Sequence, residues 1–318
     1  MSSSLVIQQS APAKLILCGE HAVVYGQPAL ALPLTDLRAE VTVRATAQGT
    51  GLHVIAPDLD EAWLVREQPA HPLSALLLST LAQLVRPEPD LSLRLRSRIP
   101  IASGMGSGAA VATALVRALA AAHAVHLPPA TIASLVYASE QRFHGTPSGI
   151  DNTVIAYEQA IWFVRAQQPA TAPTLEPLHI AVPLQLVIGD TGIRSATRLP
   201  VAAVRSGWQA DPPRYEARFA AIGELVRQAR QALAHGDQPG LGTLLTTNHG
   251  LLVELGVSSP ELDRLVAAAL AAGALGAKLA GAGWGGIMFA LVDPAATEAV
   301  ATALHQAGAA QVLITSVA

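Results

Sequence analysis

Hydrophobic and polar residues alternate along two stretches of the chain, Leu37–Arg44 and Leu91–Arg96. In the second stretch, Leu91, Leu93 and Leu95 are separated by serine and arginine. Successive side chains of a strand point to opposite faces of a sheet, so the alternation predicts strands with one buried and one solvated face. The segment Ala109–Ala124 is rich in alanine, valine and leucine and contains neither proline nor glycine, which predicts a helix.

Helix-start signals mark several further helices. Aspartate or serine is favoured at the N-cap and proline in the first turn, and Asp211-Pro212 and Ser259-Pro260 combine the two. After Asp211, apolar residues recur at helical spacing as far as Leu233. The other expected elements are helices near Pro72–Val85, Pro129–Arg142 and Pro294–Ala307 and strands near Leu52–Ile55, Ala160–Val164, Pro183–Ile188, Ile287–Val292 and Gln311–Thr315.

A glycine- and serine-rich segment, Pro100–Ala109, connects the second alternating strand to the alanine-rich helix. The first turn of a helix carries unpaired N–H groups and a partial positive charge, and glycines let a phosphate approach the backbone closely. The segment therefore predicts a phosphate-binding loop. A turn without any ligand is the alternative that this segment alone leaves open.

Composition limits the class of protein. A chain of 318 residues suits two domains at roughly 100–200 residues each, and we expect them to be 1–183 and 184–318. With a net charge of −3 and no basic run, neither nucleic acid nor a membrane is an expected partner. The uncharged stretches are too short or too interrupted to span a bilayer, and no signal peptide is recognised. The single cysteine, Cys18, fits a reducing compartment, so we expect a cytoplasmic protein.

Three other stretches carry candidate chemistry. Ala11–Gly26 places a lysine, a glutamate, a histidine and a tyrosine within an apolar run, with an edge strand of solvated side chains as the alternative. In His144–Asn152, glycine and proline end the preceding helix and place Asp151 on a constrained loop, with Glu140 near the helix end. Both acids could be plain surface residues. Gly276–Gly286 is interpreted as a glycine-packed loop before a buried strand.

Together, Ala11–Gly26, the central loop Pro100–Ala109 and Gly276–Gly286 resemble the three motifs of the GHMP kinase superfamily, in the same order. His144–Asn152 resembles a further stretch of its members. The chain reads APAKLILCGEHAVVYG at Ala11–Gly26, HGTPSGIDN at His144–Asn152 and GAKLAGAGWGG at Gly276–Gly286. The resemblance covers essentially the whole chain. It implies a two-domain α+β fold, in which the N-terminal α/β domain has a mixed sheet and a left-handed crossover, the C-terminal domain is ferredoxin-like and the active site lies in the cleft between. The opening stretch is most similar to that of members that phosphorylate mevalonate.

The resemblance also implies roles for individual residues. Asp151 would be the catalytic carboxylate that accepts, or at least orients, the proton of the substrate's terminal hydroxyl. Lys14 would lie beside it and stabilise the alkoxide and the transferred phosphoryl group. Glu140 and Ser107 would bind Mg²⁺, the implied cofactor, with ATP as co-substrate.

Two sets of binding residues follow from the same resemblance. Mevalonate would be contacted by Lys14, Glu20, His21, Asp151 and Thr197. The ATP phosphates would be bound by Pro100, Ala102, Ser103, Gly104, Met105, Gly106, Ser107, Gly108, Ala109, Gly281, Gly283 and Gly285.

Two positions depart from the family pattern. Many relatives carry two consecutive serines in the central loop, the second of which binds magnesium, whereas this chain has Ser107-Gly108. Either Ser107 supplies the hydroxyl or a water replaces it. Trp284 stands where many relatives have a fourth glycine, and the sequence does not predict whether its ring lies near the phosphates or away from them.

Several alternatives stay open. A sibling kinase would act on phosphomevalonate, homoserine or a sugar, but a doubly anionic substrate calls for more basic residues than Glu20 and His21 offer. A related decarboxylase, or a non-catalytic GHMP-fold module that only binds a ligand, is disfavoured by the presence of Lys14. A dinucleotide-binding oxidoreductase is excluded because Gly104–Gly108 lacks the Gly-x-Gly-x-x-Gly spacing. The resemblance also implies a homodimer as one oligomeric state, since dimers are frequent in this superfamily, but the sequence does not predict the oligomeric state.

Overall fold

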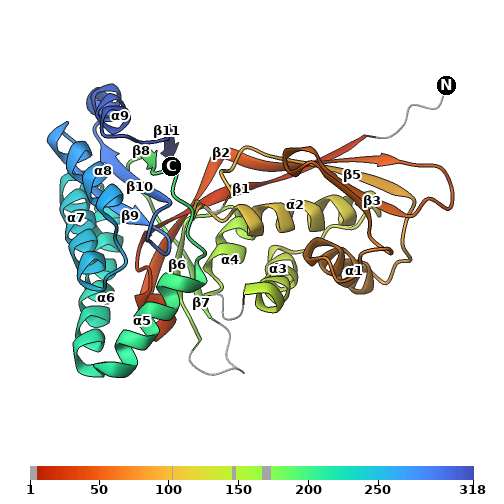
Figure 1. The fold of residues 1–318 in the computed structure, drawn as a ribbon, viewed down its shortest axis with the longest axis horizontal. Helices are drawn as coiled ribbons and strands as arrows, with labels where there is room; N and C mark the ends of the chain where they lie inside the picture. Colours follow the sequence, from red (N-terminus) through yellow and green to blue (C-terminus); the bar gives the residue numbers. More distant parts are fainter. Residues whose placement is uncertain (1–5, 102, 145–147, 167–172) are drawn as a thin grey trace. The chain divides into compact units, whose positions relative to one another are not determined.

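The computed structural model describes residues 6–101, 103–144, 148–166 and 173–318, which form two compact units (Figure 1). Unit 1 consists of the described residues within 1–13, 35–101 and 106–158. Unit 2 consists of those within 14–34, 102–105 and 159–318. Each unit combines a sheet with helices, as the expected α+β architecture requires.

Unit 1 contains a mixed sheet. Its strands are β1 (Ile7–Cys18), β2 (Pro28–Ala45), β3 (Leu52–Ala56), β4 (Glu61–Leu64) and β5 (Leu91–Ser97), of which β1 ends and β2 begins in unit 2. β2 pairs antiparallel with β5, whereas β3 pairs with β5 in parallel. Val41 lies opposite Leu95 and Val43 opposite Leu93, and all four are buried. The alternation predicted for these two strands is therefore confirmed.

The helices of unit 1 lie on one face of this sheet (Figure 1). They are α1 (Pro72–Leu84), α2 (Ser107–Ala122), α3 (Pro129–His144) and α4 (Ile150–Tyr157), with a short 3₁₀ helix, η2 (Pro57–Leu59). α2 contacts β5 as well as the three other helices, and it buries mainly alanine and leucine. Small side chains allow this helix to pack closely against its neighbours. The handedness of the crossover that leads from β3 to β5 stays a prediction.

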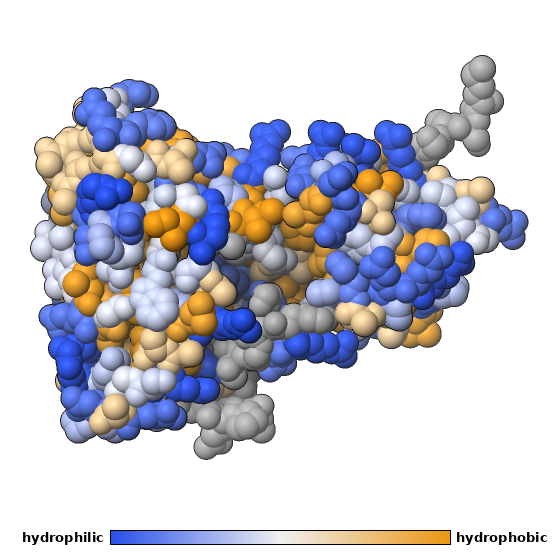
Figure 2. Space-filling model, viewed as in Figure 1, coloured by the Kyte–Doolittle hydropathy of each residue, from blue (hydrophilic) through white to orange (hydrophobic). Residues whose placement is uncertain are grey.

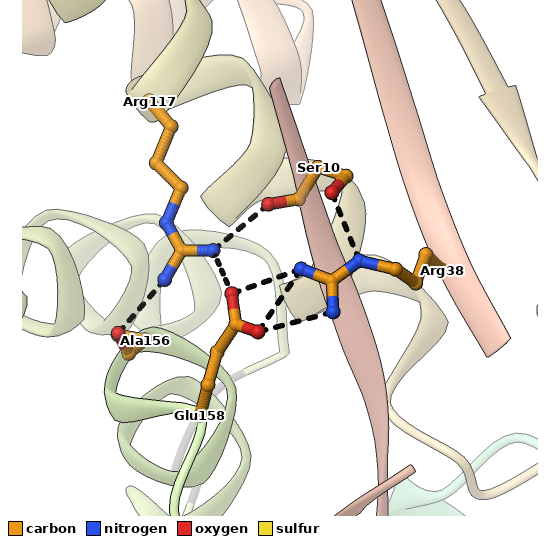
Figure 3. A network of polar contacts seen from close by, with 5 residues as sticks. All are labelled: Ser10, Arg38, Arg117, Ala156 and Glu158. Atoms are coloured by element: carbon orange, nitrogen blue, oxygen red, sulfur yellow. Dashed lines mark hydrogen bonds and ion pairs between the residues drawn. The ribbon is translucent and has the colours of Figure 1, made fainter. Parts of the chain in front are cut away.

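A network of polar contacts joins the sheet and helices of unit 1 (Figure 3). Glu158, which follows α4 with a φ of 50°, accepts three hydrogen bonds of 3.0 Å from the terminal nitrogens of Arg38 in β2. Arg117 of α2 also donates to Glu158, and to the carbonyl oxygens of Ser10 and Ala156. The side chains of these ion pairs are half-buried, so the pairs are stronger than solvent-exposed ones. They fix α2 and α4 to β2.

Unit 2 contains an antiparallel sheet of four strands in the order β11 (Gln311–Val317), β8 (Leu184–Asp190), β10 (Ile287–Val292) and β9 (Gly276–Ala280). Along the chain, helices separate β8 from β9 and β10 from β11, which is the connectivity of a ferredoxin-like domain. The expected ferredoxin-like C-terminal domain is confirmed. The strands of unit 2 are β6 (Ile161–Val164), β7 (Thr174–Pro177), β8 (Leu184–Asp190), β9 (Gly276–Ala280), β10 (Ile287–Val292) and β11 (Gln311–Val317), with β6 paired to the start of β2.

Two helices of unit 2 begin where the sequence predicts, after Asp211 and after Ser259. The Asp211 side chain accepts a hydrogen bond from the backbone N–H of Arg214, and Ser259 accepts one from Leu262, both at 3.4 Å. The elements are α5 (Arg198–Ala210), α6 (Pro212–His235), α7 (Gln238–Glu254), α8 (Pro260–Ala271), α9 (Thr297–Gln306) and the 3₁₀ helices η1 (Ala22–Tyr25) and η3 (Pro294–Ala296). The helix expected from Pro294 is therefore split into η3 and α9.

One expectation for unit 2 is wrong. Gly276–Ala280 is not part of a glycine-packed loop but forms β9, whose five residues are all buried and pair with β10. Glycine and alanine have weak strand preference, but pairing and burial override it. The loop itself is confined to 281–286.

Within the described residues, no helix is long and apolar enough to cross a membrane. Polar and apolar residues are interspersed on the face drawn in Figure 2. The large apolar side chains that reach solvent include Val85, Leu199 and Trp284. Isolated exposures of this kind are normal for a folded protein.

Candidate active site

Strand β1 and the turn after it hold three of the predicted substrate residues: Lys14 lies in the strand, and Glu20 and His21 lie in the turn. Lys14, Glu20 and His21 are 3%, 2% and 6% exposed, so the alternative of an edge strand with solvated side chains is wrong. Gly19 has a φ of 106°, and a Cβ placed there would lie 2.6 Å from the Cα of Ala29. Only glycine fits this position, and it is what lets the chain turn sharply from β1 into η1.

Glu20 forms a buried ion pair with Lys278 of β9. Lys278 is fully buried; its Nζ donates to Glu20 Oε1 and also to the carbonyl oxygen of Leu279 at 2.7 Å, and lies 5.3 Å from the centre of the Phe289 ring. The other carboxylate oxygen, Glu20 Oε2, is buried and has no hydrogen-bond partner in the described part of the chain. Lys278 could not be predicted from the sequence, because lysine is normally exposed and its partner lies 258 residues away.

His21 contacts the loop that follows β9. Its Nε2 lies 3.0 Å from the carbonyl oxygen of Ala282. A carbonyl only accepts hydrogen bonds, so Nε2 must carry the proton. Burial lowers the pKa of His21 to about 4, with Lys278 acting in the same direction and the bond to Ala282 opposing it. The imidazole is therefore neutral near pH 7.

The central loop and the last glycine loop approach each other within unit 2. A Cβ on Gly281 would lie 3.2 Å from the Cα of Gly104, and one on Gly286 would lie 2.9 Å from the carbonyl oxygen of Ser103. The backbone N–H of Lys14 donates to the carbonyl oxygen of Met105 at 3.0 Å. The three stretches singled out by the sequence thus meet through backbone contacts, which explains the need for glycine at this point.

Trp284 turns its indole toward the end of α7. The Nε1 atom donates to the carbonyl oxygen of Gly256 at 2.8 Å, and the backbone N–H donates to that of Val257 at 2.9 Å. A Cβ on the preceding Gly283 would lie 1.9 Å from the carbonyl oxygen of Val257, so the backbone is close-packed there. Trp284 itself has a φ of 56°, which is strained for a residue with a bulky side chain. These contacts attach the ring and backbone of Trp284 to the residues that follow α7.

The N-terminus of α2 in unit 1 has the features expected of a phosphate site. Gly106 is the N-cap with a φ of 72°, no side chain caps the helix and its first turn contains no acidic residue. Gly108 is exposed and has open space where a Cβ would be. An anion at this end would interact favourably with the helix dipole and the first-turn N–H groups. Of the predicted phosphate contacts, Ala102 lies outside the described residues.

Asp151 is the second residue of α4, not part of a loop as expected. Gly149 supplies the left-handed N-cap with a φ of 89°, and the Ser148 hydroxyl accepts from the N–H of Ile150, so the helix begins earlier than glycine and proline suggested. Asn152 donates to the carbonyl oxygen of Ala133 and attaches α4 to α3. Residues 145–147 of this motif lie outside the described residues.

Glu140 lies in the last turn of α3, near the helix end as predicted, and is half-buried. Thr197 is an exposed residue just before α5. The loop before Thr197 is fixed by Asp190, which accepts from both terminal nitrogens of Arg194, at 2.7 and 2.8 Å, and from the N–H of Gly192. The described residues contain no cluster of three histidine, cysteine or acidic residues that could hold a metal alone.

Comparison with known proteins identifies the family. Residues 74–159 match the model of the GHMP kinases N terminal domain, and residues 229–310 match that of the GHMP kinases C terminal domain. A mevalonate kinase of Thermococcus sibiricus is 36% identical, over 94% of this chain and 92% of that protein. The crystal structure of L. major mevalonate kinase in complex with R-mevalonate has a TM-score of 0.86 at 27% identity and covers 99% of this chain and 97% of its own.

A Streptococcus pneumoniae phosphomevalonate kinase is similar in fold, with a TM-score of 0.83, but is only 18% identical, over 97% of this chain and 99% of that one. The sibling-kinase alternative is therefore not favoured by the sequence relationship. The chain is an ATP-using enzyme that belongs to the mevalonate kinases of the GHMP kinase family.

Proposed function

We propose that the chain transfers the terminal phosphoryl group of ATP to the 5-hydroxyl of mevalonate, giving 5-phosphomevalonate and ADP. The observation that supports this best is the meeting of three stretches in unit 2: the segment from Lys14 to His21, the central loop at Gly104 and the last loop at Gly281. Phosphoryl transfer needs in-line positioning and stabilisation of negative charge rather than covalent chemistry from the protein. Backbone-lined glycine loops and buried polar side chains supply both.

The ATP phosphates are bound by the loop 100–109 and by Gly281, Gly283 and Gly285. The uncapped N-terminus of α2 and the open space at Gly108 favour an anion on this loop. Gly104 and Gly281 already approach each other so closely that larger residues would separate the two loops.

Asp151 accepts the proton of the 5-hydroxyl, or orients it for attack. A hydroxyl is a poor nucleophile at neutral pH, so a carboxylate within hydrogen-bond reach favours the reaction. Lys14 contributes a positive charge that stabilises the developing alkoxide and the transferred phosphoryl group. Glu20, His21 and Thr197 contact mevalonate together with these two residues.

Magnesium is bound by Glu140 and Ser107. The donor set fits this ion, since Mg²⁺ prefers one or two protein oxygens and completes its octahedron with phosphate oxygens and water. The carboxylate and the hydroxyl both belong to unit 1, where Ser107 opens α2 and Glu140 lies in the last turn of α3. When bound, the ion neutralises charge on the ATP phosphates.

We further propose domain limits of 1–183 and 184–318 and a cytoplasmic location, where the only cysteine stays reduced. Cys18 is buried, and burial raises the pKa of its thiol, which makes it unreactive. Assembly into a homodimer is the proposed alternative to the monomer, and sedimentation of the purified chain distinguishes them.

An assay of ADP release with ATP and Mg²⁺ tests the proposed activity. The acceptors to compare are mevalonate, phosphomevalonate, homoserine and galactose. Selective turnover of mevalonate is the expected result. Preference for another acceptor would overturn the substrate assignment, and ATP binding without turnover of any acceptor would indicate a non-catalytic module.

A further inference from the structure

The ion pair between Glu20 and Lys278 lies at the centre of unit 2 and has no role in the proposal above beyond the contact of Glu20 with the substrate. Lys278 belongs to β9, whose five residues are all buried, and it points its ammonium group at a turn that is 258 residues earlier in the chain. Removing two charges from water is costly unless each is well paired. A buried pair at this place is therefore unlike the other ion pairs of unit 2, such as Arg230–Glu176, whose side chains are 39% and 46% exposed.

Of the two carboxylate oxygens of Glu20, one has a hydrogen-bond partner in the described residues and the other has none. Lys278 donates to Glu20 Oε1 and to the carbonyl oxygen of Leu279, whereas Glu20 Oε2 is buried without a hydrogen-bond partner in the described residues. Buried carboxylate oxygens normally accept hydrogen bonds, so an unsatisfied one marks a place where a donor is missing. A carboxylate accepts from a hydroxyl and repels a carboxylate or phosphate.

We infer that Lys278 is a positioning residue for the substrate: it holds the carboxylate of Glu20 so that Oε2 accepts a hydrogen bond from a hydroxyl group of mevalonate. This inference rests on the proposed function. The neighbouring bond from His21 to Ala282 fixes the same turn from the other side, so Glu20 has little freedom to turn toward solvent.

A purely structural role would make different predictions. In that case Lys278 only neutralises Glu20, and replacing both residues by neutral ones of similar size would restore the protein, as happens when buried ion pairs are replaced by uncharged side chains. A structural role also leaves the KM of K278M for mevalonate unchanged, whereas in the positioning role this KM rises while Glu20 is still present. The two roles are separated by measuring stability and KM on the same variants.

The experiment compares K278M, E20Q/K278M and K278R with the wild type, using thermal unfolding and the ADP-release assay. For K278M we expect the KM for mevalonate to rise at least about tenfold while the KM for ATP changes less than about twofold. In E20Q/K278M the melting temperature returns toward that of the wild type but the KM for mevalonate stays raised. K278R keeps the charge and recovers part of the affinity.

The control is R230M/E176Q, which removes the exposed ion pair of the same unit and is expected to leave both KM values unchanged. Folded K278M with lowered stability but a wild-type KM for mevalonate would overturn the positioning role. If K278M does not fold, K278R decides, because a raised KM for mevalonate at near-wild-type stability supports positioning and an unchanged KM overturns it. Assays of the wild type with the other acceptors separate the proposed substrate from the proposed role of Lys278. Turnover of a different acceptor would reject mevalonate as the substrate. The KM of the variants for that acceptor would still test Lys278.

Discussion

The Nε2 atom of His21 donates a hydrogen bond of 3.0 Å to the carbonyl oxygen of Ala282, 261 residues further along the chain. This bond links the turn after β1 to the loop after β9, and the buried pair Glu20–Lys278 links the same two segments. Two polar contacts, both made by side chains that the solvent hardly reaches, thus hold together the first and last stretches that sequence analysis singled out.

The buried state of His21 predicts how stability depends on pH. Its pKa falls from an ordinary 6.5 to about 4 in the folded chain, so between these values the unfolded chain binds a proton that the folded chain does not. Stability is therefore full above pH 6.5 and is lost as the pH falls toward 4, by about 3 kcal/mol at about 1.4 kcal/mol per pKa unit. Urea unfolding across this range measures the loss. His21→Gln should flatten the dependence, whereas His235→Gln, at an exposed histidine, should leave it unchanged.

Gly281 and Gly256 form a matched pair for testing the approach of the two glycine loops. Both have a left-handed φ, of 87° and 76°, but a Cβ on Gly281 would press on the Cα of Gly104 at 3.2 Å, whereas one on Gly256 would meet nothing within 4 Å. We expect either alanine substitution to cost about 1 kcal/mol through the backbone conformation. Only Gly281→Ala should also raise the KM for ATP, by about tenfold. If the two variants had the same KM for ATP, the contact between Gly281 and Gly104 would have no role in phosphate binding.

The hydrogen bond of Trp284 to Gly256 makes a further prediction. Trp284→Phe keeps a ring but loses the 2.8 Å bond from the indole, and should lower the free energy of unfolding by about 1 kcal/mol. Trp208→Phe is the control, since its indole makes only a long, exposed bond of 3.4 Å to Glu216. Urea unfolding of the two variants measures the difference. If the Trp208 variant lost as much stability as the Trp284 variant, the bond to Gly256 would not anchor the loop.

Ser107 tests the proposed magnesium ligands. If its hydroxyl binds Mg²⁺, Ser107→Ala should raise the Mg²⁺ concentration for half-maximal activity, by about tenfold for one lost ligand. The control is Ser134→Ala, at an exposed serine of α3 whose hydroxyl bonds to its own helix. An unchanged magnesium titration for Ser107→Ala would mean that a water occupies this position.

Local patterns in the sequence predicted elements whose signals are local. α6 was predicted because Asp211-Pro212 caps it and Phe219, Ile222 and Val226 recur on one face, where they are buried. β4, α5 and α7 were not predicted. Glu61–Leu64 is too short to show a period, no side chain caps Arg198–Ala210, and glycines interrupt Gln238–Glu254. Their conformations depend on pairing and packing with distant segments, which override weak local preference.

The residues of the candidate site also divide into those with a local signal in the sequence and those without one. Glycines such as Gly104 and Gly281 could be identified from the sequence, because segments whose backbones approach closely are rich in glycine. Lys278 could not, since nothing beside it in the chain indicates that it is fully buried against Glu20. Arg194, which fixes the loop before Thr197, was also missed, although its partner Asp190 lies only four residues earlier. Ion pairs between distant segments become visible only in the folded chain.

Asp151 is the residue on which the proposed mechanism depends most. The measurement is the rate of ADP release from ATP and Mg²⁺ with saturating mevalonate, for the wild type and Asp151→Asn, alongside ATP binding to both. Asparagine keeps the size of the side chain but cannot accept the hydroxyl proton, so we expect turnover to fall by several orders of magnitude while ATP binding is largely kept. Turnover of mevalonate by Asp151→Asn at a near-normal rate would contradict the mechanism.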